Sequence, residues 1–308
     1  MAKSRIAFKL YWCNYAPMKD WDDYRLILTL HRSKTLRGAA LQLNVNHTTL
    51  SRRLVQIDKK WGTKLFERTS DGYTATNAGL QLIQTAEQIE ELAYTSERQL
   101  RSVDKDLSGD ITLSIPGAIA QFLLLEDLND FSKIYPNINL QIISSYQFAD
   151  LDRSEADVVI RGTAMPPEHL VGHKLFPYYV AVYADKDYLD SVARDDWCLT
   201  APVAKPEWVE GTSYANLPIT FISDDPVLRH QIISKGHAIG RDACYMADQE
   251  PNLIRLSDYT AIPGQDLWVL THPDLRNTPK IKTLMSFLYS KLKAKKDLIV
   301  GKAGDAIQ

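Results

Sequence analysis

The sequence lacks the signatures that would mark an enzyme or a metalloprotein. Its three cysteines, Cys13, Cys198 and Cys244, are odd in number and widely spaced, so they indicate neither a disulfide framework nor a zinc site. The seven histidines form no HExxH pattern, and the chain has no P-loop and no nucleophile elbow. Residues 236–240 hold too few glycines for a dinucleotide-binding fingerprint. We therefore expect no catalytic residue, no metal and no cofactor.

Targeting and membrane-spanning segments are also missing from the sequence. Residues 1–17 carry basic residues but no sufficient apolar run and no small-residue cleavage site, unlike a signal peptide. No stretch approaches the roughly 20 apolar residues that span a bilayer. These absences, with cysteines that we expect to stay as buried thiols, predict a cytoplasmic protein with no membrane partner. A redox-active pair of Cys198 and Cys244 is the alternative.

The charges are distributed unevenly along the chain. Residues 19–76 contain eleven Lys or Arg and six Asp or Glu, a net charge of +5, whereas the whole chain carries −2. Residues 1–18 add three further positive charges, so the remaining residues carry about −10. A basic head on an acidic body is the pattern expected of a protein that binds nucleic acid with one end.

Residues 21–61 show the periodicity of three short helices. The first covers residues 21–31, with Asp20 as its N-cap, and the second begins after Thr35. Residues 44–46 form a short connection, and Asn46 caps the third helix. The apolar stripes of the second and third helices consist of Leu36, Ala39, Ala40, Leu43, Leu50, Leu54, Ile57 and Trp61. This arrangement predicts a helix-turn-helix.

The polar side of the third predicted helix and the segment after it have the chemistry of a DNA-binding surface. Short polar groups and arginine can read base edges in the major groove, although a solvated helix face is the alternative. Residues 64–76 predict a hairpin with Asp71-Gly72 at its turn, anchored by Leu65 and Phe66. Such a ribbon would contact the DNA backbone. The predicted DNA-binding residues are Arg37, Asn46, His47, Thr48, Thr49, Ser51, Arg52, Arg53, Arg68 and Tyr73.

A long helix is predicted over residues 77–107, with Thr76 as its N-cap. Its apolar and small residues recur in alternating steps of four and three, which is typical of a two-stranded coil. They are Leu82, Ala86, Ile89, Ala93, Ser96, Leu100, Val103 and Leu107. Pairing of two copies would also double the DNA sequence that is read. A helix that lies on its own domain is the alternative.

The remaining two thirds of the chain alternate between strand and helix patterns. The predicted strands are residues 111–115, 138–144, 157–160, 179–184, 219–223, 253–256 and 267–271, and the predicted helices are 119–131, 148–154, 226–234 and 280–293. This order favours parallel α/β units with right-handed crossovers, in one or two lobes. Ligands of such folds sit beyond the carboxyl ends of the strands, often where lobes meet.

Over residues 20–293 the chain resembles the LysR-type transcriptional regulators. The matching residues of the head are Thr35-Leu36-Arg37-Gly38-Ala39-Ala40, Val45-Asn46-His47-Thr48-Thr49-Leu50-Ser51-Arg52-Arg53, Leu65-Phe66-Glu67-Arg68 and Thr76-Asn77-Ala78-Gly79. Those of the body are Gly109-Asp110-Ile111, Tyr135-Pro136, Ala156-Asp157-Val158-Val159-Ile160-Arg161 and residues 268–273. Gly38 stands where alanine is usual in this family, and Ile57-Asp58 where Leu-Glu is usual.

The resemblance implies an α/β fold with an N-terminal all-α winged helix-turn-helix, a long linker helix and a C-terminal two-lobed domain like periplasmic binding proteins. The expected boundaries are 1–17 for a poorly ordered leading segment, 18–76 for the head and 77–107 for the linker. The alternative for the leading segment is that translation starts at Met18. Residues 108–163 with 270–295 would form lobe I, 164–269 lobe II and 296–308 a tail. The chain would cross between lobes near residues 162–167 and 265–273.

The function implied by the resemblance is sequence-specific transcriptional regulation, in which a small-molecule effector in the cleft modulates operator binding. The implied partners are double-stranded DNA, the effector, further copies in a homodimer or tetramer and, for an activator, the transcription machinery. By position, the effector would contact Ser114, Pro116, Gly117, Ala118, Ser145, Tyr146, Arg161, Thr163, Ser223 and Asp224.

Two alternatives stay open for these residues and for the chain. Arg161 could pair with a carboxylate of the effector, or it could be an ordinary structural arginine at a strand end. The whole chain could also be a solute-binding or enzymatic α/β protein whose head is only an interaction module.

Overall fold

The computed structural model describes residues 21–102, 106–256 and 259–302. Some of the predictions concern residues outside these ranges, namely the leading segment, Met18, Asp20 and Val103. The chain divides into two compact units between Tyr94 and Thr95, and each is described by itself.

None of the helices in the described ranges combines the length and apolarity that crossing a membrane requires.

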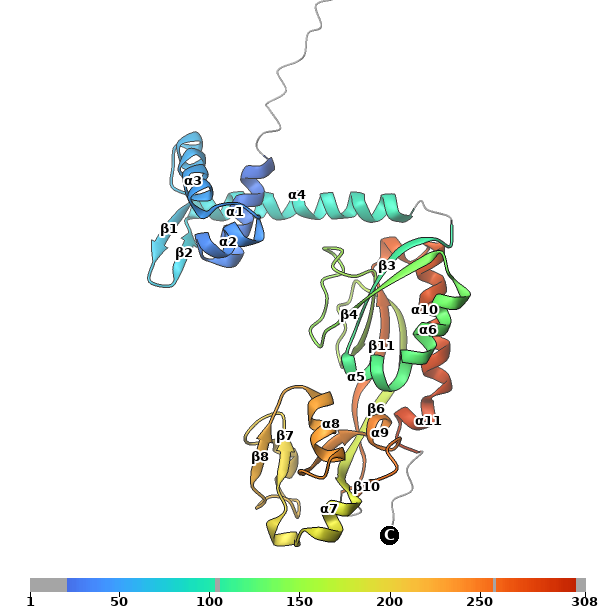
Figure 1. Ribbon diagram of the computed structural model, residues 1–308. Helices are drawn as coiled ribbons and strands as arrows, with labels where there is room; N and C mark the ends of the chain where they lie inside the picture. The colour runs from blue at the N-terminus through green and yellow to red at the C-terminus, as the bar shows by residue number, and fades with distance from the viewer. Residues whose placement is uncertain (1–20, 103–105, 257–258, 303–308) are drawn as a thin grey trace, which may run out of the picture. The chain divides into compact units, whose positions relative to one another are not determined.

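The first unit is a winged helix-turn-helix, as predicted (Figure 1). It contains α1 (Trp21–Ser33), α2 (Leu36–Gln42) and α3 (His47–Trp61), followed by the antiparallel strands β1 (Phe66–Thr69) and β2 (Gly72–Ala75). The predicted caps are present, since the Thr35 hydroxyl accepts the Gly38 N–H at 3.0 Å and the Asn46 side chain accepts the Thr48 N–H at 2.9 Å. The small core contains Leu30, Ala39, Leu50, Ile57 and Leu65.

The hairpin between β1 and β2 turns one residue earlier than predicted. Thr69 pairs with Gly72, so its two-residue loop is Ser70-Asp71 rather than Asp71-Gly72. Gly72 has a φ of +118°, and a Cβ there would lie 2.3 Å from the carbonyl oxygen of Lys34. The neighbouring Tyr73 N–H donates to the same oxygen at 2.7 Å. Gly72 is therefore used for a close approach of the ribbon to the segment between α1 and α2.

The long helix α4 is described over Asn77–Ser102, and residues 106 and 107, the predicted end of this helix, are not helical. The Thr76 hydroxyl accepts the Gly79 N–H at 3.1 Å and donates to the Lys64 carbonyl at 2.9 Å, which ties the helix to the chain before β1. Ala86, predicted for the dimer seam, is buried in the core of the first unit instead, beside Ile83. Further along the helix Leu92 and Leu100 are 67% and 76% exposed.

The second unit is built on one mixed sheet in the order β4-β3-β5-β11-β6-β9-β7-β8, with β10 paired to β6. The strands are β3 (Gly109–Ile115), β4 (Ile138–Ser144), β5 (Val158–Gly162), β6 (Val171–Asp185), β7 (Leu199–Ala201), β8 (Ile219–Ile222), β9 (Ile239–Ala243), β10 (Leu253–Arg255) and β11 (Ile262–Thr271). Strands β3, β4 and β5 pair in parallel, as do β7, β8 and β9. However, β11 and β6 run antiparallel to their neighbours, so the prediction of purely parallel units is wrong for these two strands.

Helices cover this sheet around two separate cores. The helices are α5 (Gly117–Ile119), the π-helical turn η2 (Ala120–Leu124), α6 (Leu125–Ile134), α7 (Lys186–Ser191), α8 (Pro226–Ser234), α9 (Cys244–Ala247), α10 (Pro279–Ala294) and α11 (Lys296–Ile299). In lobe I, α6 and α10 lie side by side along the strands, over a core with Leu113, Phe131 and Leu284 (Figure 1). The core of lobe II includes Val182, Leu199 and Ile239. Strands β6 and β11 are common to both lobes.

The described structure departs from several predicted elements, each for a local reason. The helix predicted over 148–154 is wrong, because the Asp150 carboxylate accepts the Arg153 N–H at 3.2 Å and the segment forms turns. Strands β7 and β9 were missed, since β7 is only three residues long and Arg241 and Asp242 interrupt the apolar run of β9. Strands β6 and β11 extend well beyond the predicted 179–184 and 267–271.

The first unit yields a test of how tightly α4 docks on the ribbon. A Cβ on Gly79 would lie 2.1 Å from the Leu65 carbonyl oxygen. We expect Gly79→Ala to destabilise this unit by ~1–3 kcal/mol through overpacking. Hydrogen exchange of the α1–α3 amides in the full chain would measure the loss. Gln81→Ala, on the exposed side of the same helix, is the control, and equal exchange in both variants would contradict the expectation.

Candidate DNA-reading face and effector cleft

Helix α3 has one face in the core and the opposite face in water. Leu50, Leu54 and Ile57 are all buried, at 7% exposure or less. On the other side the exposed residues, here called the reading face, are His47, Thr48, Thr49, Arg52 and Val55. All except Val55 lie in the first two turns of the helix, where hydroxyls and a guanidinium are suited to base edges and phosphates.

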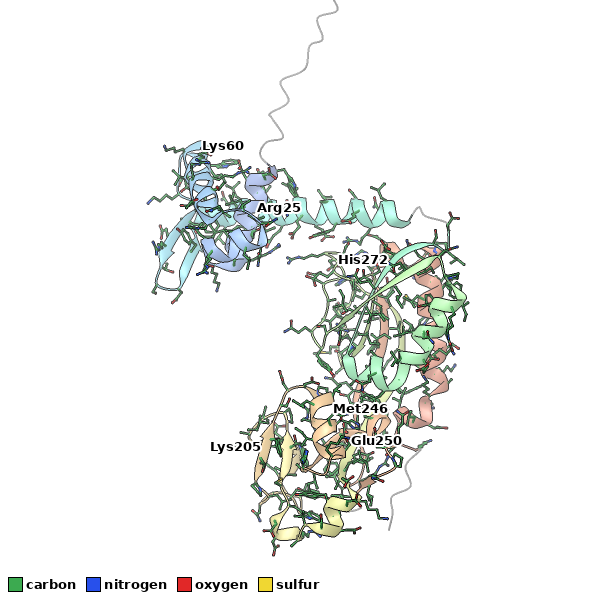
Figure 2. All side chains as sticks on the ribbon, viewed as in Figure 1. Arg25, Lys60, Lys205, Met246, Glu250 and His272 are labelled. Carbon is green, nitrogen blue, oxygen red and sulfur yellow. The ribbon has the colours of Figure 1, made fainter. Side chains whose placement is uncertain are left out.

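Other predicted DNA-binding residues lie differently on the first unit. The Arg53 Nε donates to Asp23 of α1 at 3.0 Å, and Lys60, labelled in Figure 2, lies 3.4 Å from the same carboxylate. Arg53 therefore fixes α3 to α1, and its predicted role on DNA would require this pair to open. Ser51 is partly buried, Asn46 is engaged as the cap of α3, and Arg37 is exposed on α2.

The ribbon places a cation and a tyrosine opposite each other. Arg68 on β1 pairs in register with Tyr73 on β2. Arg68 is exposed, whereas Tyr73 is partly buried against the core. Arg68 is thus the more accessible of the two for a phosphate contact.

In the second unit, a cavity of about 390 Å³ opens between the lobes. Five of the predicted effector residues line it, namely Pro116, Ala118, Tyr146, Arg161 and Asp224. Met246 of α9, labelled in Figure 2, is also part of the lining. The cavity lies beyond the carboxyl ends of β3 and β5, which is where the strand order led us to expect a ligand.

The other predicted effector residues form the loops behind the lining. Hydroxyl oxygens of Ser145, Thr163 and Ser223 each accept a backbone N–H two residues further on, at 3.1–3.2 Å. Ser114 is buried and its hydroxyl accepts from Arg161. A Cβ on Gly117 would lie 3.0 Å from the Ser144 hydroxyl, so the chain is tightly packed there. These five residues shape the site rather than lining it.

Arg161 is a buried cation whose hydrogen bonds go to neutral oxygens. Its Nε donates to the Gln147 carbonyl at 3.1 Å, Nη1 to the Ile160 carbonyl at 2.7 Å and Nη2 to Ser114 Oγ at 2.7 Å. Burial lowers the pKa of Arg161 to about 10. No carboxylate forms an ion pair with it in the described ranges.

The lining contains residues that the sequence prediction missed. Arg229 of α8 donates from Nη1 to the Ser223 carbonyl at 2.6 Å, and Arg241 of β9 lies 5.7 Å from the Trp208 ring. Tyr178 and Tyr245 add two phenols, and burial raises the pKa of each. One sequence signal could have identified part of this lining, namely the charged pair Arg241-Asp242 inside an otherwise apolar run.

Asp242 lines the cavity but is occupied on both carboxylate oxygens. Its Oδ2 lies 2.7 Å from Nδ1 of His230, which is fully buried, and its Oδ1 accepts the Ala243 N–H at 2.8 Å. The ring of Phe122 from lobe I packs edge-on against His230, with centroids 4.8 Å apart. This pair is closed off from the cavity on the imidazole side.

The cysteines of the second unit are free thiols. Cys198 is partly buried, and Cys244 is buried. Burial raises the pKa of the Cys244 thiol, which disfavours the reactive thiolate. The alternative of a redox-active pair therefore gains no support from the environment of Cys244.

Comparisons with known proteins agree with this architecture. The family described as "Bacterial regulatory helix-turn-helix protein, lysR family" matches residues 21–80, and "LysR substrate binding domain" matches residues 104–293. The uncharacterized HTH-type transcriptional regulator YkuM of Bacillus subtilis is 26% identical over 272 residues, covering 74% of this chain and 90% of that protein. The iron-regulated virulence regulatory protein IrgB of Vibrio cholerae is 28% identical over 172 residues, covering 56% of this chain and 57% of that protein.

Solved structures share the fold at low sequence identity. The full-length structure of the Vibrio cholerae virulence activator AphB, a member of the LTTR protein family, superposes with a TM-score of 0.56 at 18% identity. That similarity covers 87% of this chain and 98% of AphB. It includes the order of a helix-turn-helix followed by an α/β domain.

Arg52 and Arg68 should affect DNA binding in different ways. We expect Arg52→Ala to flatten the preference at one base pair by ~1–3 kcal/mol, because a guanidinium can read a guanine edge. Arg68→Ala should weaken binding to all sequences alike, because a phosphate contact carries no sequence information. Affinities for duplexes selected from a random pool would measure both effects. Unchanged DNA binding in both variants would refute the assignment of reading face and ribbon.

Proposed function

The chain belongs to the LysR family of bacterial helix-turn-helix regulators, and we propose which of its surfaces bind DNA and which bind the effector. It is a DNA-binding transcriptional regulator with an effector-responsive domain. In our proposal the reading face of α3 enters the major groove while Arg68 of the ribbon contacts a phosphate. The observation that carries this proposal is the polarity of α3, which buries Leu50, Leu54 and Ile57 in the core, whereas Trp61, predicted in the same stripe, is 44% exposed at the end of the helix.

The effector-binding site in this proposal is the cavity between the lobes. Side chains from both lobes line it, so a bound molecule would favour one lobe arrangement over another by its differential contacts. We propose binding rather than catalysis there. The His230–Asp242 pair, the arrangement nearest to acid–base machinery, has its imidazole fully buried. A cytoplasmic location would accompany the DNA target.

Pairing of two copies along α4 belongs to the same proposal. Leu100 is 76% exposed on this helix and lies in the predicted seam, whereas Ala86 is already used by the core of the first unit. Two paired reading faces would recognise a near-palindromic site, and two dimers would make a tetramer. If the regulator is an activator, the transcription machinery would be a further partner.

Salt dependence of DNA binding tests the function directly. We expect the affinity for selected duplexes to fall by ~10³-fold or more between ~50 mM and ~200 mM salt, because neutralised phosphates release counterions. Fluorescence anisotropy on the full chain would measure it. Tight binding of a solute with no sequence-dependent DNA binding would instead favour a solute-binding protein.

The proposed seam on α4 gives a separate prediction. We expect Leu100→Glu to weaken binding to a two-half-site operator by ~10²-fold or more, because two reading faces would no longer act together. Binding to a single half-site should be unchanged. Gln88→Glu, an equal charge change at an exposed position of the same helix, is the control. A variant that stays dimeric in sedimentation and keeps full operator affinity would exclude this seam.

A further inference from the structure

Three guanidinium groups line the cavity between the lobes without a carboxylate partner. They belong to Arg161, Arg229 and Arg241. Across the described ranges, none of the three takes part in an ion pair. Elsewhere in the chain arginines do have such partners. Arg255, for example, binds Asp248 through two hydrogen bonds of 2.7 and 2.9 Å, and Arg32 binds Glu90 at 2.7 Å. The cavity is therefore lined by three arginines that form no ion pair with a carboxylate within the described residues.

The two carboxylates of the lining form no ion pair with these cations within the described residues, although the charge of Asp242 raises the pKa of Arg229. Asp242 is engaged by His230 and by the Ala243 N–H. Asp224 is exposed to solvent, where its charge is screened, and it forms no ion pair with the arginines within the described residues. The lining thus has a net positive character that the protein's own side chains leave in place.

Leaving cations partly desolvated beside each other is energetically unfavourable. Burial lowers the pKa of Arg229, and the nearby charge of Arg241 lowers it further, while Asp242 and Asp225 act in the opposite direction. Burial likewise lowers the pKa of Arg161. An anion entering the cavity would replace the lost solvation of Arg161 and Arg229 and reduce the repulsion between Arg229 and Arg241.

We propose that the effector is a small organic carboxylate whose carboxylate group lies between Arg229 and Arg241. This assignment rests on the proposed function and adds the chemical class of the effector to it. Arg229 uses one Nη for the Ser223 carbonyl. The Arg241 guanidinium lies near the Trp208 ring and donates no hydrogen bond within the described residues, so both arginines retain N–H groups for a carboxylate. The fork of N–H donors on a guanidinium matches the two oxygens of a carboxylate.

Arg161 contributes through its charge rather than through direct contact. Its nitrogens already donate to Gln147, Ile160 and Ser114. It is only 2% exposed, so its N–H groups are directed into the protein. Its positive field still reaches the cavity that it lines, because screening is weak at buried sites.

The remaining lining is suited to the carbon skeleton of such a molecule. Tyr146, Tyr178 and Tyr245 line the space, and the rings of Tyr178 and Tyr245 meet edge to face with their centroids 6.2 Å apart. A volume of about 390 Å³ suits a metabolite-sized ligand. A carboxylate held on lobe II would place its skeleton against Tyr146, and so would contact both lobes at once.

Thermal unfolding of the full chain tests this assignment with matched acids and amides. The probes are benzoate against benzamide and succinate against succinamide, with inorganic phosphate as a different anion, all at equal ionic strength. We expect a saturable rise of a few °C in Tm with at least one carboxylate and none with its amide, because only the folded form holds the ligand. Arg229→Gln and Arg241→Gln should each reduce the rise, and the double variant should abolish it. Arg194→Gln, an exposed arginine of lobe II outside the cavity lining, should leave it unchanged.

The melting temperatures of the variants without any added ligand provide a second measurement. Because Arg241 pairs with no carboxylate within the described residues, Arg241→Gln should melt at or close to the temperature of the unaltered chain. A clear fall in its Tm would mean that Arg241 has a structural role, and would overturn the proposal. The proposal is also overturned if neither carboxylate raises the Tm, if the amides act equally well, if phosphate alone acts, or if the double variant responds like the unaltered chain.

Parallel DNA-binding measurements separate this inference from the function on which it rests. A chain that binds selected duplexes but shows no carboxylate-dependent shift would refute only the effector class. A chain that binds no duplex in a sequence-dependent way would refute the proposed function, whatever the carboxylates do.

Discussion

The packing of Leu50, Leu54 and Ile57 against α1 and α2 is the interaction on which the DNA-reading surface depends. Because these three side chains are buried, the opposite side of α3 is held in water and cannot rotate inward without opening the core. The Arg53–Asp23 pair and the bond from the Leu65 N–H to Asp58 Oδ1, at 3.0 Å, fix the helix to α1 and to the chain before the ribbon. A rigid helix with a preset polar face needs little reorganisation before it meets a groove.

In the second unit, close packing against a tyrosine ring constrains the shape of the cavity. The ring of Tyr178 lies against two glycines, since a Cβ on Gly162 would be 3.0 Å and one on Gly264 2.7 Å from its atoms. Side chains at these positions would displace the ring and change the space beside the arginines. Tyr178 lies on β6 and Gly264 on β11, the two strands shared by both lobes, so the cavity is shaped in part by the same backbone that joins the lobes.

The sequence was sufficient to predict an element where one local physical preference dominates the segment. Apolar periodicity located α2 and α3, and capping chemistry identified Thr35, Asn46 and Thr76. It was insufficient where long-range pairing decides, as for β9, whose Arg241 and Asp242 break the strand pattern because they face a cavity. The same limit applies to the effector site. Position along the strands pointed to Arg161 and Tyr146, but only the folded chain brings Arg229 and Arg241 to the same space, from a helix and a strand of lobe II.

Chemical protection of a selected operator tests the central claim most directly. Dimethyl sulfate methylates guanine N7, which faces the major groove. If the reading face of α3 enters that groove, the bound protein should protect guanine N7 at two places about one helical turn apart, and Arg52→Ala should remove protection at the guanines it contacts. Protection of the phosphates with fully reactive N7 positions would contradict the account, because it would place the protein on the backbone without the helix in the groove.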